Sequence, residues 1–196
     1  MFTGSGVALV TPFKDGEIDD EALRSHIEEQ IQKGTQFLVP CGTTGESATL
    51  THEEHDRVVD ITVEVAAGRV KVLAGAGSNS TEEAIRLTQH AKNSGADGVL
   101  HINPYYNKPT QEGLYQHYSA LAQATRLPIL VYNVPGRTGS NVEPKTLARL
   151  AAFANIIGVK EASGNISQID EILRSLSTQF GPERFRVISG DDALTL

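Results

Sequence analysis

The stretch IIGVKEAS, residues 156–163, places a single ammonium group on an otherwise apolar strand candidate. Side chains alternate between the two faces of a strand, so Gly158, Lys160 and Ala162 are predicted to share one face. These small neighbours leave room beside the amine, and burial of an amine lowers its pKa because it favours the neutral form. A neutral lysine is a nucleophile that forms Schiff bases with carbonyl substrates. The alternative is a lysine at a strand end whose amine reaches water.

Composition limits the function classes that need to be considered. The chain has 196 residues and a formal net charge of -7, which fits one domain and argues against a nucleic-acid partner. No apolar run reaches the length of a membrane span, and residues 1–6 lack the pattern of a signal peptide. Cys41 is the only cysteine, so no disulfide can form within the chain. We therefore predict a cytoplasmic protein with no nucleic-acid or membrane partner.

Short apolar runs alternate with longer stretches of helical periodicity. The predicted strands are Val7–Thr11, Phe37–Cys41, Val70–Ala74, Gly98–Asn103, Pro128–Val134, Ile156–Ala162 and Phe185–Ser189. The predicted helices are Asp19–Lys33, Thr51 to about Ala67, Ser80 to about Ser94, Gln111–Ala124, Pro144–Phe153 and Ser167–Leu176. Capping boxes are expected where Thr51 and Ser80 each precede a glutamate by three residues. This alternation predicts parallel strands with helical crossovers.

Two parallel architectures compete, a doubly wound nucleotide-binding sheet and a TIM (β/α)8 barrel. The first requires a glycine-rich phosphate loop, and neither residues 12–16 nor residues 75–77 have that pattern. Polar residues instead follow several strands, as in barrel enzymes. They lie at 42–46, 105–107, 132–133 and 160–161. We predict an α/β fold of the barrel class.

The barrel predicted from this chain is incomplete. Seven strand candidates leave the eighth strand and the C-terminal helical region unaccounted for. Residues 1–196 are therefore expected to form a single catalytic barrel domain truncated at its C-terminal end, either as a fragment or as a short natural form.

Four strand-end motifs resemble the dihydrodipicolinate synthase family, which belongs to the pyruvate-dependent Schiff-base aldolases. The motifs occur in the family's order, and the similarity runs from near residue 1 to residue 196. They are GTTGE at 42–46, PYYNKP at 104–109, YNVPGRTG at 132–139 and GVKEASG at 158–164.

The resemblance implies condensation of pyruvate with aspartate 4-semialdehyde to 4-hydroxy-tetrahydrodipicolinate, the first committed step of diaminopimelate and lysine biosynthesis. Lys160 would form an imine with pyruvate, and Tyr132 would move protons beside it. Thr43 and Tyr106 match the other members of the family's proton relay, with Tyr106 entering from a neighbouring subunit. Proton transfer requires donors within hydrogen-bond reach, which suits these hydroxyl groups. No cofactor is implied.

The resemblance also assigns substrate-binding residues. The turn at Thr43 and Thr44 would hold the pyruvate carboxylate on backbone N–H groups. Arg137 matches the guanidinium that binds the carboxylate of the aldehyde substrate, and Gly190 matches a glycine close to the substrate. N-acetylneuraminate lyase and the keto-sugar-acid aldolases share the lysine and the tyrosine and remain alternatives, as does an inactive relative. The paired threonines and Arg137 favour the synthase.

The histidines raise the question of a metal or regulatory site. His52 and His55 are separated by three residues rather than the four of the zincin pattern, so no metal is predicted. In lysine-inhibited family members, the matching positions form a pocket for lysine at a subunit interface. The positions here are Ser47, Ala48, His52, His55, Asn79, Glu83 and Tyr105. The resemblance thus implies feedback inhibition by lysine and a homotetramer built as a dimer of dimers.

Overall fold

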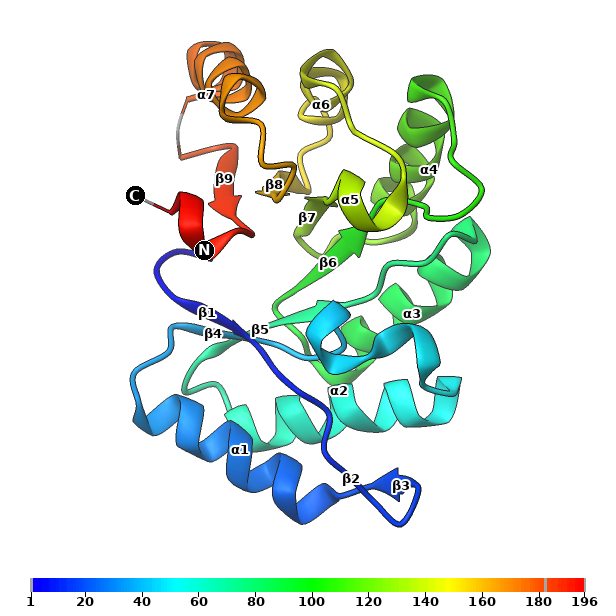
Figure 1. Ribbon diagram of the computed structural model, residues 1–196, viewed down its shortest axis with the longest axis vertical. Coiled ribbons are helices and arrows are strands. Elements are labelled where there is room, and N and C mark those ends of the chain that lie inside the picture. The colour runs from blue at the N-terminus through cyan, green and yellow to red at the C-terminus, as the bar shows by residue number, and fades with distance from the viewer. Residues whose placement is uncertain (1, 182, 196) are drawn as a thin grey trace. The chain divides into compact units, whose positions relative to one another are not determined.

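The computed structural model describes residues 2–181 and 183–195 (Figure 1). The chain divides into two compact units, Met1–Ala76 with Leu87–Leu100 and Gly77–Arg86 with His101–Leu196. Each unit is described by itself.

Seven strands are hydrogen bonded in chain order, and the recorded pairings between them are all parallel. They are β1 (Gly6–Ala8), β4 (Phe37–Val39), β5 (Lys71–Gly75), β6 (Gly98–Ile102), β7 (Ile129–Asn133), β8 (Ile156–Glu161) and β9 (Arg186–Ser189). All seven predicted strands are confirmed, although most end earlier than predicted. Parallel pairing throughout confirms the expected α/β class.

The first unit packs α1 (Asp20–Gln32) against α2 (His52–Ala66) beside its strands. Asp19 Oδ1 accepts a hydrogen bond from Ala22 N at 3.0 Å and starts α1. The predicted capping box of Thr51 is present in full at the start of α2. Leu23 and Ile27 of α1 are fully buried, and Ile31, one turn further along the same face, is half-buried.

The second unit carries α4 (Gln111–Ala124), α6 (Pro144–Leu150) and α7 (Ile166–Phe180). Helix α6 contacts both α4 and α7, so the three lie side by side (Figure 1). Their buried faces are made by Leu114, Leu121, Leu147, Ile172 and Leu176. Helix α3 (Thr81–Ser94) has residues in both units, and its first turn lies in the second. Strands β7 and β8, which carry the candidate catalytic residues, belong to the same unit.

Two elements were not predicted from the sequence. The short strands β2 (Phe13–Lys14) and β3 (Glu17–Ile18) form an antiparallel hairpin. Asp15 and Gly16 close it with φ angles of 54° and 88°, as an Asp-Gly hairpin turn requires. The other element is α5 (Pro135–Thr138), a four-residue helix that carries Arg137.

Two predicted helix boundaries were wrong, and one predicted cap has a different partner. Helix α6 ends at Leu150, three residues early, and α7 extends to Phe180. Ser80 Oγ accepts from Glu83 N at 3.3 Å as predicted, while Ser80 N donates to Ser78 Oγ at 3.0 Å.

Candidate active site

Lys160 lies near the carboxyl end of β8, directly beside Tyr132 of β7. The two are register partners in the parallel ladder, and the Lys160 Nζ atom is 4.4 Å from the centroid of the Tyr132 ring. Tyr132 is 7% exposed, and Lys160 is half-buried rather than extended into solvent. The backbone pairing of β7 and β8 thus brings the predicted nucleophile and the predicted proton-transfer residue together.

Gly158 and Gly190 both lie near Lys160, but the absence of a side chain has a different consequence at each position. A Cβ atom at Gly158 would lie 2.3 Å from the carbonyl oxygen of Arg186, so this glycine permits close approach of β8 and β9 rather than room beside the amine. A Cβ atom at Gly190 would lie 3.0 Å from both Lys160 Cε and Ala162 Cβ. Gly190 is therefore the residue that leaves space along the lysine stem.

The electrostatic environment favours a reactive amine. Burial lowers the pKa of Lys160, the carboxylate of Asp192 opposes this by raising it, and the guanidinium of Arg137 lowers it. The net effect is a lowered pKa of Lys160. At a pH below the pKa of an ordinary lysine, a larger fraction of this amine is therefore neutral and nucleophilic.

Imine formation with pyruvate is expected to show this shift directly. Because only the neutral amine attacks, the rate rises with pH and levels off above the pKa of Lys160, with a midpoint below that of an exposed lysine. Asp192→Asn removes the charge that raises this pKa and is expected to move the midpoint to lower pH. The measurement is the rate of borohydride trapping against pH. Asp170→Asn, on the exposed side of α7, is the matched control and should leave the midpoint unchanged. An unchanged or higher midpoint for Asp192→Asn would contradict this assignment.

Arg137 and Tyr106 also belong to the second unit. Arg137 is exposed on α5, and its charge reaches Lys160 strongly enough to affect the lysine pKa. Tyr106 is 89% exposed and has a φ angle of 70°, a conformation that costs a bulky residue about 1–2 kcal/mol. An exposed aromatic ring on a strained backbone is typical of a functional loop.

Thr43 and Thr44 lie in the first unit, in the 3-10 turn Thr43–Gly45 that follows β4. Gly45 N donates back to the Gly42 carbonyl at 3.0 Å, and Thr11 Oγ1 donates to the Gly45 carbonyl at 2.8 Å. The first N–H groups of such a turn have no acceptor within it and point outward. Both threonines are exposed, so the N–H groups of this turn are candidates for holding a small anion.

Three of the predicted regulatory residues, Asn79, Glu83 and Tyr105, belong to the second unit. Burial raises the pKa of the Tyr105 phenol, and the negative charge of Glu83 raises it further. The Asn79 carbonyl accepts from Asn107 Nδ2 at 3.3 Å. Glu83 also accepts a hydrogen bond from Ser78 Oγ. The negative charge of Glu83 therefore acts on the Tyr105 phenol.

The other four regulatory residues belong to the first unit. Ser47 and Ala48 lie in the 3-10 turn Ser47–Thr49, and exposed His52 is the first residue of α2. The His55 ring is buried and differs from the others in this respect.

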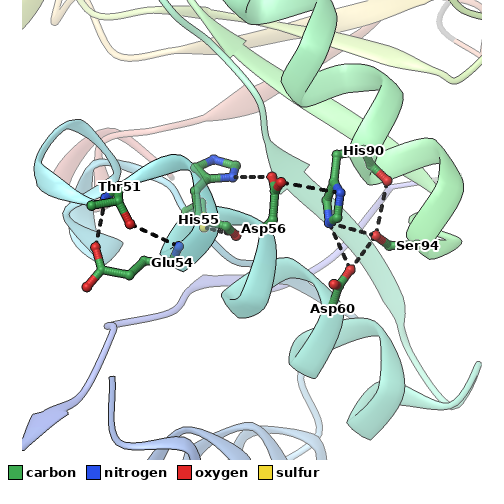
Figure 2. A network of polar contacts seen from close by, with 8 residues as sticks. Thr51, Glu54, His55, Asp56, Asp60, His90 and Ser94 are labelled. Carbon is green, nitrogen blue, oxygen red and sulfur yellow. Dashed lines mark hydrogen bonds and ion pairs between the residues drawn. The ribbon is translucent and has the colours of Figure 1, made fainter. Parts of the chain in front are cut away.

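His55 takes part in a polar network between α2 and α3 (Figure 2). Asp56 lies between two histidines, with its oxygens 4.0 Å from His55 Nδ1 and 3.5 Å from His90 Nδ1. His90 Nε2 contacts Asp60 at 2.9 Å, and Ser94 Oγ contacts the same ring nitrogen at 3.1 Å. These contacts join α2 to the part of α3 that belongs to the first unit.

Asn133 and Glu161 are among the polar residues predicted at strand ends, but the sequence assigned them no role. Asn133 and Glu161 follow Tyr132 and Lys160 directly, and they are 0% and 1% exposed. Period-2 alternation places them on the opposite face, where an apolar residue is expected. A polar residue at a strand position where the alternation predicts an apolar one was the sequence signal that could have revealed their role. Asp192 was also missed as a charge that acts on Lys160.

Two features are absent from residues 2–181 and 183–195. No group of three or more His, Cys, Asp or Glu side chains is placed to hold a metal ion. In the same part of the chain, no helix is both long and apolar enough to cross a membrane.

Parallel β/α barrel proteins carry their chemistry at the carboxyl ends of the strands, and the residues described above define a protein of that class. The chain belongs to the dihydrodipicolinate synthetase family, whose model matches residues 1–196.

Similar proteins agree with this membership. The chain is 60% identical over 196 residues to 4-hydroxy-tetrahydrodipicolinate synthase of Syntrophus aciditrophicus (strain SB), covering 100% of the chain and 66% of that relative. The chain therefore spans about two thirds of the length of the curated relatives it matches.

Solved structures share the fold. The structure resembles dihydrodipicolinate synthase from Aquifex aeolicus, with a TM-score of 0.95 and 52% identity, covering 100% of this chain and 65% of that one. For the chloride-inhibited synthase from Acinetobacter baumannii complexed with pyruvate, the TM-score is 0.93 at 48% identity, with 98% and 65% covered. For the Cyanidioschyzon merolae enzyme with lysine bound, it is 0.92 at 43% identity, again with 98% and 65% covered. The fold is the TIM-barrel fold of this family, of which the chain contains seven strands.

Proposed function

We propose that this chain is the catalytic part of a 4-hydroxy-tetrahydrodipicolinate synthase, acting in the cytoplasm in diaminopimelate and lysine biosynthesis. The observation that carries the proposal is the half-buried Lys160 amine beside Tyr132, with a pKa lowered by burial, in a chain of this family. A relative of the same fold is complexed with pyruvate. Residues 1–196 are proposed to act as one catalytic domain.

In the first half-reaction, the neutral amine of Lys160 attacks the ketone carbon of pyruvate. Water leaves as the imine forms, with Tyr132 as the proposed proton donor and acceptor beside the amine. Loss of a methyl proton then gives an enamine. Thr44 and Thr43 are proposed to hold the pyruvate carboxylate on the N–H groups of their turn, and Gly190 leaves the space that the lysine stem and substrate occupy.

In the second half-reaction, the enamine carbon forms a bond with the aldehyde carbon of aspartate semialdehyde. The guanidinium of Arg137 is proposed to bind the carboxylate of this substrate in a bidentate contact. The substrate amino group then attacks the imine carbon and closes the ring, which releases Lys160. Thr43 and Tyr106 complete the proposed proton relay. The exposure of the Tyr106 ring supports its insertion into a neighbouring subunit of a homotetramer.

Product analysis tests this function. The protein is incubated with pyruvate and aspartate semialdehyde, and separately with N-acetylneuraminate and keto-sugar acids, and the products are identified by mass spectrometry. The proposal expects the cyclic condensation product from the first mixture alone. Turnover of a sugar acid without condensation would assign the chain to another aldolase, and no reaction in any mixture would indicate an inactive relative.

We also propose that lysine inhibits this protein. A relative of the same fold has lysine bound, and the carboxylate of Glu83, whose charge acts on the Tyr105 phenol, is suited to the ammonium group of such a ligand. Ser47, Ala48, His52, His55 and Asn79 are the other proposed members of this site.

Lysine titration of the initial rate is expected to show loss of activity. Glu83→Gln, which removes the charge opposite the ligand ammonium, should raise the half-inhibitory lysine concentration about tenfold or more. Glu82→Gln, at the exposed neighbouring position, is the control and should leave that concentration unchanged. A wild-type rate that does not respond to lysine would rule out this form of regulation.

A further inference from the structure

The strand that carries Lys160 also carries a buried carboxylate, Glu161, on its other face. Neutral amide groups donate hydrogen bonds to this carboxylate. Glu161 is 1% exposed, and its oxygens accept from Asn133 Nδ2 at 3.1 Å each, from Ser163 N at 2.9 Å and from Gln168 Nε2 at 3.4 Å. Burial of a carboxylate is costly unless its acceptor positions are filled. Four donor contacts fill them here, so Glu161 is held in one orientation.

Asn133 connects this carboxylate to neighbouring segments. It is fully buried and is the register partner of Glu161, just as Tyr132 is the partner of Lys160. Its Oδ1 atom accepts from Asn103 Nδ2 and from Val142 N, both at 3.0 Å. Its Nδ2 atom donates to Asn141 Oδ1 at 2.8 Å as well as to Glu161. One side chain therefore joins β7 and β8 to the returning end of the loop at residues 134–142.

A reciprocal amide pair fixes that loop to α7. Asn141 Nδ2 donates to Gln168 Oε1 at 2.8 Å, and Gln168 Nε2 donates back to Asn141 Oδ1 at 3.1 Å. The same loop contains α5 with exposed Arg137, and Thr138 Oγ1 donates to the Ser140 carbonyl at 2.8 Å just beyond it. The loop that presents Arg137 is thus attached to the Lys160 strand by side-chain amides. We call Asn133, Asn141, Glu161 and Gln168 the amide cluster.

We propose that the amide cluster is a positioning device that sets the place of Arg137 relative to Lys160 and so governs recognition of the carboxylate-bearing aldehyde. This inference rests on the proposed function and assigns a role to residues that contact neither substrate. The backbone ladder of β7 and β8 already fixes Lys160 beside Tyr132, so imine formation does not depend on the cluster. Bidentate binding by Arg137 does depend on it, because a misplacement of about 1 Å can cost about a hundredfold in rate.

The test separates the two substrates kinetically in the full-length protein. Asn141→Ala and Gln168→Met each remove the reciprocal amide pair, and the second keeps the volume of the side chain. Both are expected to raise KM for aspartate semialdehyde about tenfold. KM for pyruvate and the rate of borohydride trapping with pyruvate are expected to stay within about twofold of wild type. Thermal unfolding and circular dichroism establish that each variant is folded.

Asn155→Ala is the matched control. Asn155 Nδ2 also makes two amide contacts in this unit, to the carbonyls of Ala122 at 3.0 Å and Thr125 at 2.9 Å, but it lies at the opposite end of β8. This variant loses comparable bonds and should leave KM for the aldehyde unchanged.

Three outcomes would overturn the inference while leaving the proposed function standing. These are an unchanged aldehyde KM in both folded cluster variants, an equal rise in the KM of both substrates, and a similar rise in Asn155→Ala. A wild-type protein that is not trapped with pyruvate would instead refute the proposed function itself, which keeps the two failures distinguishable.

Discussion

Lys160→Ala is expected to lower the rate of condensation by about four orders of magnitude or more, as removal of a covalent nucleophile does in other enzymes. The register of β7 and β8 places this amine beside Tyr132. The measurement is the steady-state rate with saturating pyruvate and aspartate semialdehyde. Since Lys160 is half-buried and Gly190 lies against its stem, the variant should remain folded.

Lys145→Ala is the matched control for this prediction. Lys145 is exposed on α6, so its loss should leave the rate within about twofold of wild type. A Lys160→Ala protein that is folded and retains a substantial rate would show that the imine does not form there.

Arg137→Ala is expected to reduce kcat/KM for aspartate semialdehyde by about two orders of magnitude or more, because truncation of a charge-paired arginine costs about 2–5 kcal/mol. Pyruvate trapping on Lys160 should remain largely intact, since Arg137 is assigned to the second substrate only. The loss of its charge should also raise the pKa of Lys160, which moves the trapping profile to higher pH. Single-turnover trapping and the steady-state rate are measured on the same preparation.

Arg149→Ala provides the control arginine. Arg149 is an exposed residue of α6 that pairs with Glu112 at 2.8 Å and stacks over Tyr115. Its replacement should change stability slightly and kcat/KM little. Loss of pyruvate trapping in a folded Arg137→Ala protein would mean that the assigned role of Arg137 is wrong.

The order of strands and helices could be predicted because it depends on local patterns. Apolar runs, capping residues such as Thr51 and helix-ending glycines such as Gly34, which directly follows the predicted helix Asp19–Lys33, depend only on residues close by in the sequence. The absence of a glycine-rich phosphate loop after the first strand then favoured the TIM barrel over the doubly wound nucleotide-binding sheet. The hairpin closed by Asp15 and Gly16 was missed although its turn signal was present, because its strands are only two residues long.

The surroundings of Lys160 were predicted in part. The reactive character of Lys160 could be anticipated from its apolar surroundings, and burial does lower its pKa. The reason given for Gly158 was wrong, since this residue is required by the approach of the Arg186 carbonyl. The amide cluster could not be predicted because Asn133 and Gln168 lie 35 positions apart and share the partners Asn141 and Glu161 only through tertiary packing. The only sequence signal for the amide cluster was the position of Asn133 and Glu161 on a strand face where apolar residues are expected.

The most direct test of the central claim is identification of the residue that pyruvate modifies. The wild-type protein is incubated with pyruvate, reduced with borohydride, digested and sequenced by tandem mass spectrometry. A single reduced adduct on Lys160, which fails to form when pyruvate is omitted, is the predicted result. An adduct on another lysine, or no adduct while the protein catalyses condensation, would contradict the mechanism.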